Sequence, residues 1–189
     1  MKDKKCITIP RPTKKEVGKC LKIWKDNPEY YESENALLNL FQKTYPKNTN
    51  LEEILIKVSA LDVLYSTGVK FYSLAKMAQH ILDNKIDCLL EKNNTDVISV
   101  ISTVGGKNFY AFATKYCHFQ KPATFPIYDS NVVKALKCFK HYFPELDLNN
   151  IRNYTTYKDI LDKFINKFQL EKHYSEIDHY LYQIGKKLK

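Results

Sequence analysis

Apolar residues recur along this sequence at intervals of three and four positions, the spacing that places them on one face of an α-helix. The first such segment opens with the capping box Thr13-Lys14-Lys15-Glu16, in which threonine and glutamate side chains satisfy free backbone amides at a helix start. The apolar positions that follow it are Val17, Cys20, Leu21 and Trp24. No long stretch alternates apolar and polar residues as a half-buried strand does. The pattern therefore predicts an all-α fold.

Residues that interrupt helices divide the rest of the chain. Pro28 ends the first helix, Tyr45-Pro46 ends the second, and Gly68 is placed to end the third in a left-handed turn. After the first helix, we predict helices over residues 29–44, 51–66, 72–82, 87–92, 95–103, 107–119, 131–143, 156–168 and 175–188. No internal repeat, low-complexity segment or shift in composition marks a linker. We therefore predict one compact helical domain over residues 1–189.

The chain of 189 residues is long enough to bury one hydrophobic core without disulfides or a metal. Its cysteines are odd in number and show no C-x-x-C spacing: Cys6, Cys20, Cys88, Cys117 and Cys138. We expect buried thiols in a reducing cytoplasm, with no bound metal or cofactor. The charged N-terminus leads into Pro10 and Pro12, so we expect neither a signal peptide nor a membrane-spanning segment. A cytoplasmic monomer is the expected state.

Positive charge dominates the composition. Thirty Lys and Arg residues stand against twenty-one Asp and Glu residues, which leaves a net charge of +9. Such a charge attracts polyanions and speeds their capture, so DNA is the expected partner. Almost all of these cations are lysine, however, and a lysine-rich coding bias raises the charge of a protein without any ligand. A helical protein that binds no nucleic acid is therefore an open alternative.

Two of the five glycines are adjacent, Gly105 and Gly106, between the apolar run of residues 97–104 and the helix predicted from Lys107. Adjacent glycines let the backbone turn tightly and let another backbone come close. If the turn points at a phosphate, the amides and the positive dipole end of the next helix bind it without reading the base sequence. A helix cap followed by a plain turn is the alternative.

The segment around the glycine pair carries a longer pattern. Val104-Gly105-Gly106-Lys107 precedes a predicted helix, which leads to Lys121-Pro122 and then to Pro126-Ile127-Tyr128-Asp129. This order resembles the helix-hairpin-helix DNA glycosylase superfamily, in which a V-G-x-K hairpin is followed by a helix, a K-P turn and a P-V-D segment whose aspartate begins the next helix. The resemblance covers residues 104–133 directly. It implies a central helix-hairpin-helix element, with the hairpin and candidate active site at about residues 97–133.

The resemblance implies a DNA glycosylase that excises a damaged or modified base in repair or defence, with AP-lyase activity as a possible addition. Asp129 would be the catalytic carboxylate, because breaking the glycosidic bond develops positive charge on the sugar. Lys107 would be the amine that attacks the sugar C1′ in bifunctional members, and Lys115, about two turns along the same helix, is the alternative amine. Without a catalytic role, Asp129 would be a plain N-cap of the helix that follows it. The iron–sulfur branch of the superfamily is excluded, since no four-cysteine cluster lies near the C-terminus.

The same resemblance implies a DNA interface and a pocket for a base flipped out of the duplex. The backbone-binding residues would be Gly105, Gly106, Lys107, Asn108 and Lys121, and the pocket candidates are His118, Phe125 and Tyr128. Aromatic residues at helical spacing and lone histidines are more often structural, so core packing is the alternative for the three pocket candidates. The alternative function is a non-catalytic DNA-binding module that retains the fold.

Overall fold

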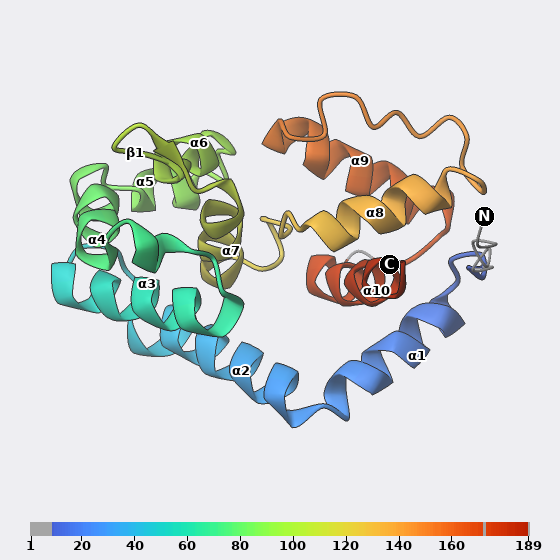
Figure 1. Cartoon of the computed structure of the whole chain (residues 1–189), viewed down its shortest axis with the longest axis horizontal. Coiled ribbons are helices and arrows are strands. Elements are labelled where there is room, and N and C mark those ends of the chain that lie inside the picture. The colour runs from blue at the N-terminus through green and yellow to red at the C-terminus, as the bar shows by residue number, and fades with distance from the viewer. Residues whose placement is uncertain (1–8, 172, 189) are drawn as a thin grey trace, which may run out of the picture. The chain divides into compact units, whose positions relative to one another are not determined.

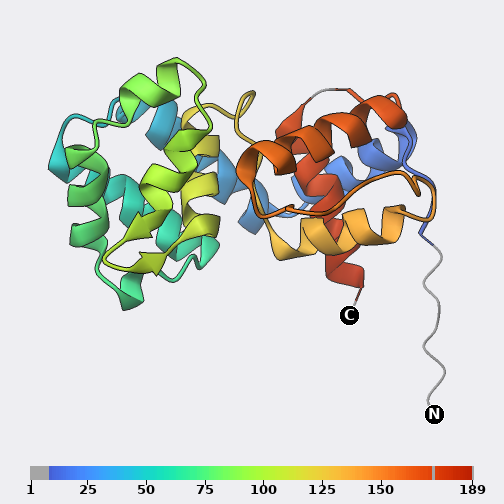
Figure 2. The ribbon, with the colours of Figure 1, turned by 90° about the horizontal axis from the view of Figure 1, so that it is seen from above.

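The computed structural model describes residues 9–171 and 173–188, which form two compact units (Figures 1 and 2). The central unit comprises residues 24–128. The terminal unit comprises the described residues up to 23 together with those from 129 onward. Most of the described residues are helical, which confirms the prediction of a mainly helical fold. That the chain is a single glycosylase-like domain stays a prediction.

The central unit contains helices from α2 to α7, coloured from light blue to yellow-green in Figure 1. Their bounds are α2 (Pro28–Asn39), α3 (Leu51–Tyr65), α4 (Leu74–Asp83), α5 (Asp87–Glu91), α6 (Asp96–Ser102) and α7 (Tyr110–Gln120). A π-helical turn, η1 (Leu40–Thr44), continues α2, and a 3-10 turn, η2 (Val69–Phe71), precedes α4. Two short strands, β1 (Thr103–Val104) and β2 (Lys107–Asn108), pair between α6 and α7.

The paired strands differ from the purely helical prediction. Helices are predicted over residues 95–103 and 107–119, yet residues 103–104 and 107–108 are antiparallel strands, and α7 begins only at Tyr110. The physical reason is the two-residue turn at Gly105 and Gly106, which reverses the chain tightly enough for the flanking residues to hydrogen-bond to each other. The all-α prediction therefore holds as a mainly helical fold, and only the helix ends predicted on either side of the glycine pair are corrected, to one small β-hairpin.

Local capping explains where several helices start. Asn27 Oδ1 accepts a hydrogen bond from the amide of Glu29 at 3.1 Å, and Asn50 Oδ1 accepts one from the amide of Glu52 at 2.9 Å. The threonine half of the predicted capping box is also present, because Thr13 Oγ1 accepts a hydrogen bond from the amide of Glu16 at 3.2 Å. Each contact satisfies an amide that has no partner within its helix.

Helix α7 lies in the core of the central unit, and every residue from Phe112 to Phe119 is buried. Its Tyr116 ring lies 5.0 Å from the Phe41 ring of η1, and its Phe119 ring lies 5.4 Å from the Tyr65 ring of α3. Aromatic pairs at these separations contribute packing beyond the area they bury. The chain on either side of α7 is thus held by a well-packed helix.

A buried lysine organises the loop before α3. The Lys57 ammonium is fully buried and donates hydrogen bonds to the carbonyl oxygens of Tyr45 and Lys47, at 3.1 and 2.9 Å, and to Asn48 Oδ1 at 2.6 Å. The Tyr116 hydroxyl donates to the same Asn48 oxygen at 2.6 Å. Burial lowers the pKa of Lys57 to about 8, because it penalises the charged amine.

The terminal unit consists of α1 (Lys14–Lys25) as far as Ile23, with α8 (Ser130–Phe139), α9 (Tyr154–Lys167) and α10 (Tyr174–Lys187). Helices α8 and α10 approach closely because Gly185 has no side chain; a Cβ there would collide with the carbonyl group of Asn131. The Phe139 and Tyr180 rings of the same two helices also stack, with their centroids 5.9 Å apart. No helix within the described ranges combines the length and the apolar character needed to cross a membrane.

The cysteines are only partly as expected. Cys20 and Cys117 are buried free thiols, which confirms the prediction for these two. The prediction is wrong for Cys88 and Cys138, which are exposed because they lie on the solvent-facing sides of α5 and α8. Cys6 lies outside the described residues.

Candidate nucleic-acid interface

The hairpin between α6 and α7 is a tight two-residue turn. Val104 pairs with Lys107 across it, and both glycines have positive φ angles, 55° at Gly105 and 72° at Gly106. Two successive residues in this left-handed region define a type I′ turn, which favours glycine at both positions. Residues 105–108 are all exposed. The glycine pair therefore shapes a narrow tip that presents backbone without side-chain bulk to solvent.

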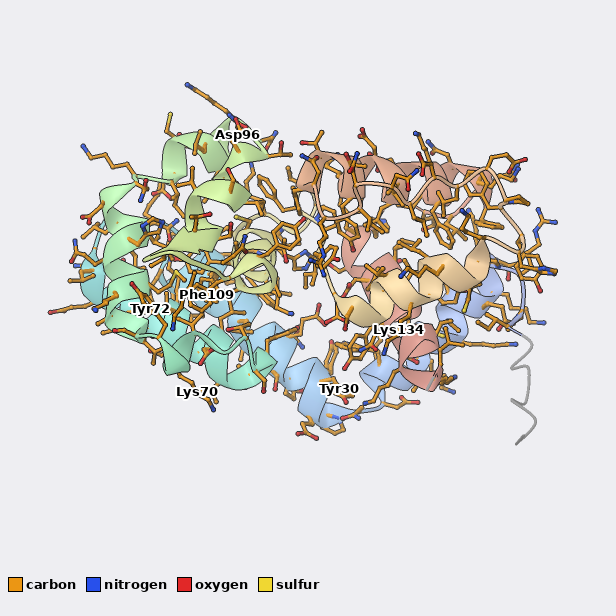
Figure 3. The ribbon with its side chains drawn as sticks, turned by 45° about the horizontal axis from the view of Figure 1, so that its top comes forward. Tyr30, Lys70, Tyr72, Asp96, Phe109 and Lys134 are labelled. Atoms are coloured by element: carbon orange, nitrogen blue, oxygen red, sulfur yellow. The ribbon has the colours of Figure 1, made fainter. Side chains whose placement is uncertain are left out.

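Tyr72, from the segment between η2 and α4, supports this tip. A side chain at Gly105 would collide with the Tyr72 hydroxyl, and the Tyr72 ring lies 5.6 Å from the Phe109 ring at the start of α7. Figure 3 labels both rings, which lie next to each other beside the hairpin. The tight approach at Gly105 is a second reason for glycine there, independent of the turn.

The ammonium groups of two lysines from different segments lie near the Tyr72 ring. The ammonium of Lys107, on β2, lies 5.4 Å from the ring centroid, and that of Lys76, on α4, lies 5.7 Å from it. Both distances fall within the range of cation–π attraction. Neither ammonium forms an ion pair with another described residue. We call Tyr72, Lys76 and residues 105–108 the hairpin surface.

The turn that leads to Tyr72 is fixed by the buried carboxylate of Asp62. It accepts hydrogen bonds from the Thr67 hydroxyl at 2.5 Å, the amide of Val69 at 2.8 Å and the amide of Lys70 at 3.1 Å. Burial acts to raise the pKa of Asp62, but these hydrogen bonds outweigh it, and the pKa lies below its ordinary value. An ionised Asp62 thus holds the segment that carries Tyr72 and Lys76.

Lys115, the alternative amine, lies in a different environment from Lys107. It is 6% exposed, and its ammonium lies 5.8 Å from the centroid of the Tyr65 ring. The preceding residue, Thr114, accepts a hydrogen bond from the amide of Tyr128 at 3.2 Å. The middle of α7 therefore holds the stretch of chain that ends at Tyr128.

The three pocket candidates are covered by the central unit to different degrees. His118 is 1% exposed, and its Nδ1 atom lies 2.8 Å from the carbonyl oxygen of Phe125, which is itself fully buried. Tyr128 is partly exposed, and its ring lies 4.9 Å from that of Tyr110, whose hydroxyl is buried without a hydrogen-bond partner. Burial raises the pKa of Tyr110. That these residues line a base pocket stays a prediction, and in this structure His118 and Phe125 are part of the core.

The predicted DNA-binding residues do not all lie together. The hairpin brings Gly105, Gly106, Lys107 and Asn108 to one exposed tip. Lys121 follows the other end of α7, roughly 16 Å away along an 11-residue helix. Its ammonium donates to the Leu90 carbonyl at 3.0 Å and to Asn93 Oδ1, which ties it to the end of α5.

Asp129 is the N-cap of α8, and its Oδ1 atom accepts a hydrogen bond from the amide of Asn131 at 2.7 Å. It belongs to the terminal unit, whereas Lys107 and Lys115 belong to the central unit. That they share one cavity stays a prediction. Among the residues that the structure describes, no three His, Cys, Asp or Glu side chains gather as a metal site requires.

Sequence reasoning missed Tyr72, Lys76 and Asp62. They lie outside residues 97–133, and no local motif marks them. The available signal was weak: Tyr72 and Lys76 flank Ser73, a good N-cap, so both had to lie near a helix start. Their proximity to the glycine pair depends on tertiary packing alone.

Comparison with known proteins places the chain in a family. Residues 16–124 match the family model HI_0787_N, described as an N-terminal domain. The chain is also 33% identical over 148 residues to an uncharacterized protein of Haemophilus influenzae, across 75% of this chain and 70% of that relative. No solved structure matches. The chain therefore belongs to the HI_0787_N family, and the matched range contains α2 to α7 with the whole hairpin surface.

Proposed function

We propose that this protein binds duplex DNA through the hairpin surface and excises a base from it, as a DNA glycosylase of the helix-hairpin-helix superfamily. The observation that carries the proposal is the order of elements around the glycine pair: α6, a two-residue hairpin with an exposed glycine tip, and α7. Lys121-Pro122 and Pro126-Ile127-Tyr128-Asp129 follow in sequence, with Asp129 at the start of α8. This is the order that the sequence resemblance requires.

The chemistry of the tip suits a phosphate backbone. Because Gly105 and Gly106 carry no side chains, a phosphate can approach the chain closely there. Lys107 and Lys76 add positive charge beside the tip, and lysine contacts to phosphates provide affinity without base specificity. The net charge of +9 strengthens the attraction at long range.

Base excision breaks the bond between the sugar C1′ and a base nitrogen. Water supplies a hydroxyl group to C1′ and a proton to the leaving base, and the carboxylate of Asp129 stabilises the positive charge that develops on the sugar. In a lyase reaction an amine would displace the base and form an imine with the opened sugar. We assign that amine to Lys115, because Thr114 beside it holds Tyr128, the residue before Asp129, and we assign phosphate contact to Lys107.

The test is base release from DNA. The protein is incubated with duplexes that carry uracil, 8-oxoguanine, alkylated purines or an abasic site, and strand cleavage is read after alkali treatment. Covalent complexes are trapped with borohydride. We expect release of at least one base, and we expect Asp129→Asn to lower its rate by at least about a hundredfold. Asparagine also caps helices well, so the variant should remain folded.

Asp147→Asn is the matched control, since it makes the same chemical change at an exposed loop carboxylate of the terminal unit. It should leave base release unchanged. Lys115→Gln should abolish any borohydride-trapped complex, whereas Lys107→Gln should keep it. The absence of both base release and covalent trapping across the panel would reject the proposed glycosylase activity.

The second candidate is a DNA-binding module without catalysis. The observation in its favour is the hydrogen bond from the Asn131 amide to Asp129, because N-capping alone explains an aspartate at that position. This candidate predicts salt-dependent binding to DNA, no base release, and equal affinity in the parent protein and in Asp129→Asn. Base release that disappears in the variant while binding persists would exclude it.

A further inference from the structure

We propose that Lys76 and Lys107, held on the ring of Tyr72, form a clamp for one or two neighbouring phosphates of the nucleic-acid backbone. The clamp rests on the proposed DNA binding and adds Lys76 as a binding residue and Tyr72 as a positioning residue. Neither residue lies in the segment that resembles a glycosylase. The phosphate ligand belongs to a polynucleotide strand rather than to a free nucleotide.

The first argument is the convergence of two positive charges. Each ammonium lies within 6 Å of the same ring centroid, so the two cannot be more than about 11 Å apart. Successive phosphates of one strand are separated by about 3.4 Å along the duplex axis, so both lysines can reach the same phosphate or close neighbours. A single surface lysine would make one such contact, and this pair makes two.

The second argument is that these charges lack compensation within the described part of the chain. Two like charges within about 11 Å of each other repel. No carboxylate of the described residues forms an ion pair with either ammonium group. An anion bound by both ammonium groups would relieve the repulsion and gain two charge-assisted contacts. Lys47 shows the contrast, because it pairs with Glu91 at 2.9 Å.

The third argument is that the Tyr72 ring, which both ammonium groups approach, is itself fixed. Tyr72 is confined by Phe109 on one side and by the closely approaching Gly105 on another. Asp62 anchors the turn that precedes it through the amides of Val69 and Lys70. Long lysine side chains lose conformational entropy when they bind a ligand, and attraction to a fixed ring lowers that cost.

The fourth argument is the neighbouring hairpin tip. Gly105 contacts the Tyr72 hydroxyl directly, so the tip and the two ammonium groups form one continuous surface. The exposed backbone of residues 105–108 offers a place for the phosphate that the lysines attract. The hairpin surface therefore combines exposed backbone, which a phosphate can approach closely, with two positive charges beside it.

The experiment measures the affinity of the full chain for a fluorescent 20-base-pair duplex between 50 and 200 mM salt, by anisotropy. Lys76→Gln and Lys107→Gln should each reduce the slope of log affinity against log salt, and the double variant should reduce it by about 0.9 for each phosphate that the clamp holds. Tyr72→Leu should reduce the slope although it removes no charge, and Tyr72→Phe, which keeps the ring, should restore it.

Lys43→Gln is the matched control. Lys43 is an exposed lysine of η1. Its neighbour Gln42 donates a hydrogen bond to the carbonyl oxygen of Phe119, which lies at the end of α7 that is far from the hairpin. A slope change in Lys76→Gln no larger than in Lys43→Gln would overturn the clamp while leaving the proposed DNA binding intact. A parent protein that does not bind the duplex would overturn both. A mononucleotide that competes as well as DNA of equal phosphate concentration would overturn the assignment to a polynucleotide.

Discussion

The central unit holds lysine ammonium groups against aromatic rings in two opposite surroundings. Lys57 is fully buried, 5.4 Å from the Phe41 ring centroid, and three oxygen atoms accept its hydrogens. Lys76 and Lys107 are exposed beside the Tyr72 ring and form no ion pair with any other described residue. Lysine ammonium groups of this unit thus lie near aromatic rings both in the core and at the surface.

The difference lies in what satisfies the charge. The oxygens around Lys57 belong to the protein, so its hydrogen bonds tie the loop at residues 45–48 to α3 and leave nothing for a ligand. Lys76 and Lys107 form no ion pair with a described residue, and in our proposal a bound phosphate compensates both charges. A net charge of +9 therefore says little about function by itself. The positions of the cations that have no anionic partner are more informative about function.

The largest expected effect is on the free energy of unfolding, when the buried Lys57 is replaced. Lys57→Met removes the hydrogen-bond donor from three oxygen atoms and should lower the free energy of unfolding by about 3 kcal/mol, measured by urea denaturation. The matched change Lys43→Met, at an exposed site of the same unit, should stay within about 0.5 kcal/mol of the parent protein.

The comparison also predicts what Lys57→Met leaves alone. At a temperature where the variant remains folded, the salt slope of DNA binding should equal that of the parent protein, because the buried charge makes no phosphate contact. A reduced slope in a folded Lys57→Met protein would remove the distinction between structural and ligand-binding lysines.

Local chemistry explains which parts of this arrangement were predictable from sequence. The starts of α2 and α3 follow from Asn27 with Pro28 and from Asn50, because caps and prolines act within a few residues. The turn at Gly105 and Gly106 was predictable for the same reason. The strands around it were not, because the sequence alone does not decide between a helix cap with a plain turn and the tight turn that pairs the flanking residues.

Long-range contacts explain what sequence reasoning could not reach. Tyr72 lies more than thirty residues before the hairpin that it supports, and only packing brings them together. Helical spacing also cannot tell a pocket wall from a core position. His118 and Phe125, predicted as pocket candidates, are both buried here, and their mutual hydrogen bond gives them a structural role.

A smaller effect is expected at the hairpin, where the two glycines provide an internal control. Alanine at either position is strained by a positive φ angle, at a cost of about 1 kcal/mol. Gly105→Ala should cost about 1 kcal/mol more than Gly106→Ala, because only its Cβ collides with Tyr72. Gly105→Ala should also weaken DNA binding more, since the collision displaces the ring that holds both lysines. Equal effects of the two substitutions on stability and affinity would show that the Tyr72 side chain moves aside with no loss of stability or affinity.

The smallest effect is a pH dependence that belongs to the buried lysine alone. Burial lowers the pKa of Lys57 to about 8 in the folded chain, whereas an unfolded lysine titrates near 10.4. Between these values the unfolded chain binds more protons at this site, so the free energy of unfolding rises with pH there. The stability difference between the parent protein and Lys57→Met should therefore widen by about 1 kcal/mol from pH 8 to pH 9, because the neutral amine still donates hydrogen bonds without the penalty of a buried charge. Urea denaturation of both proteins at the two pH values measures this difference. A gap that narrows with rising pH would mean that the surrounding oxygens stabilise the charged form more than burial opposes it.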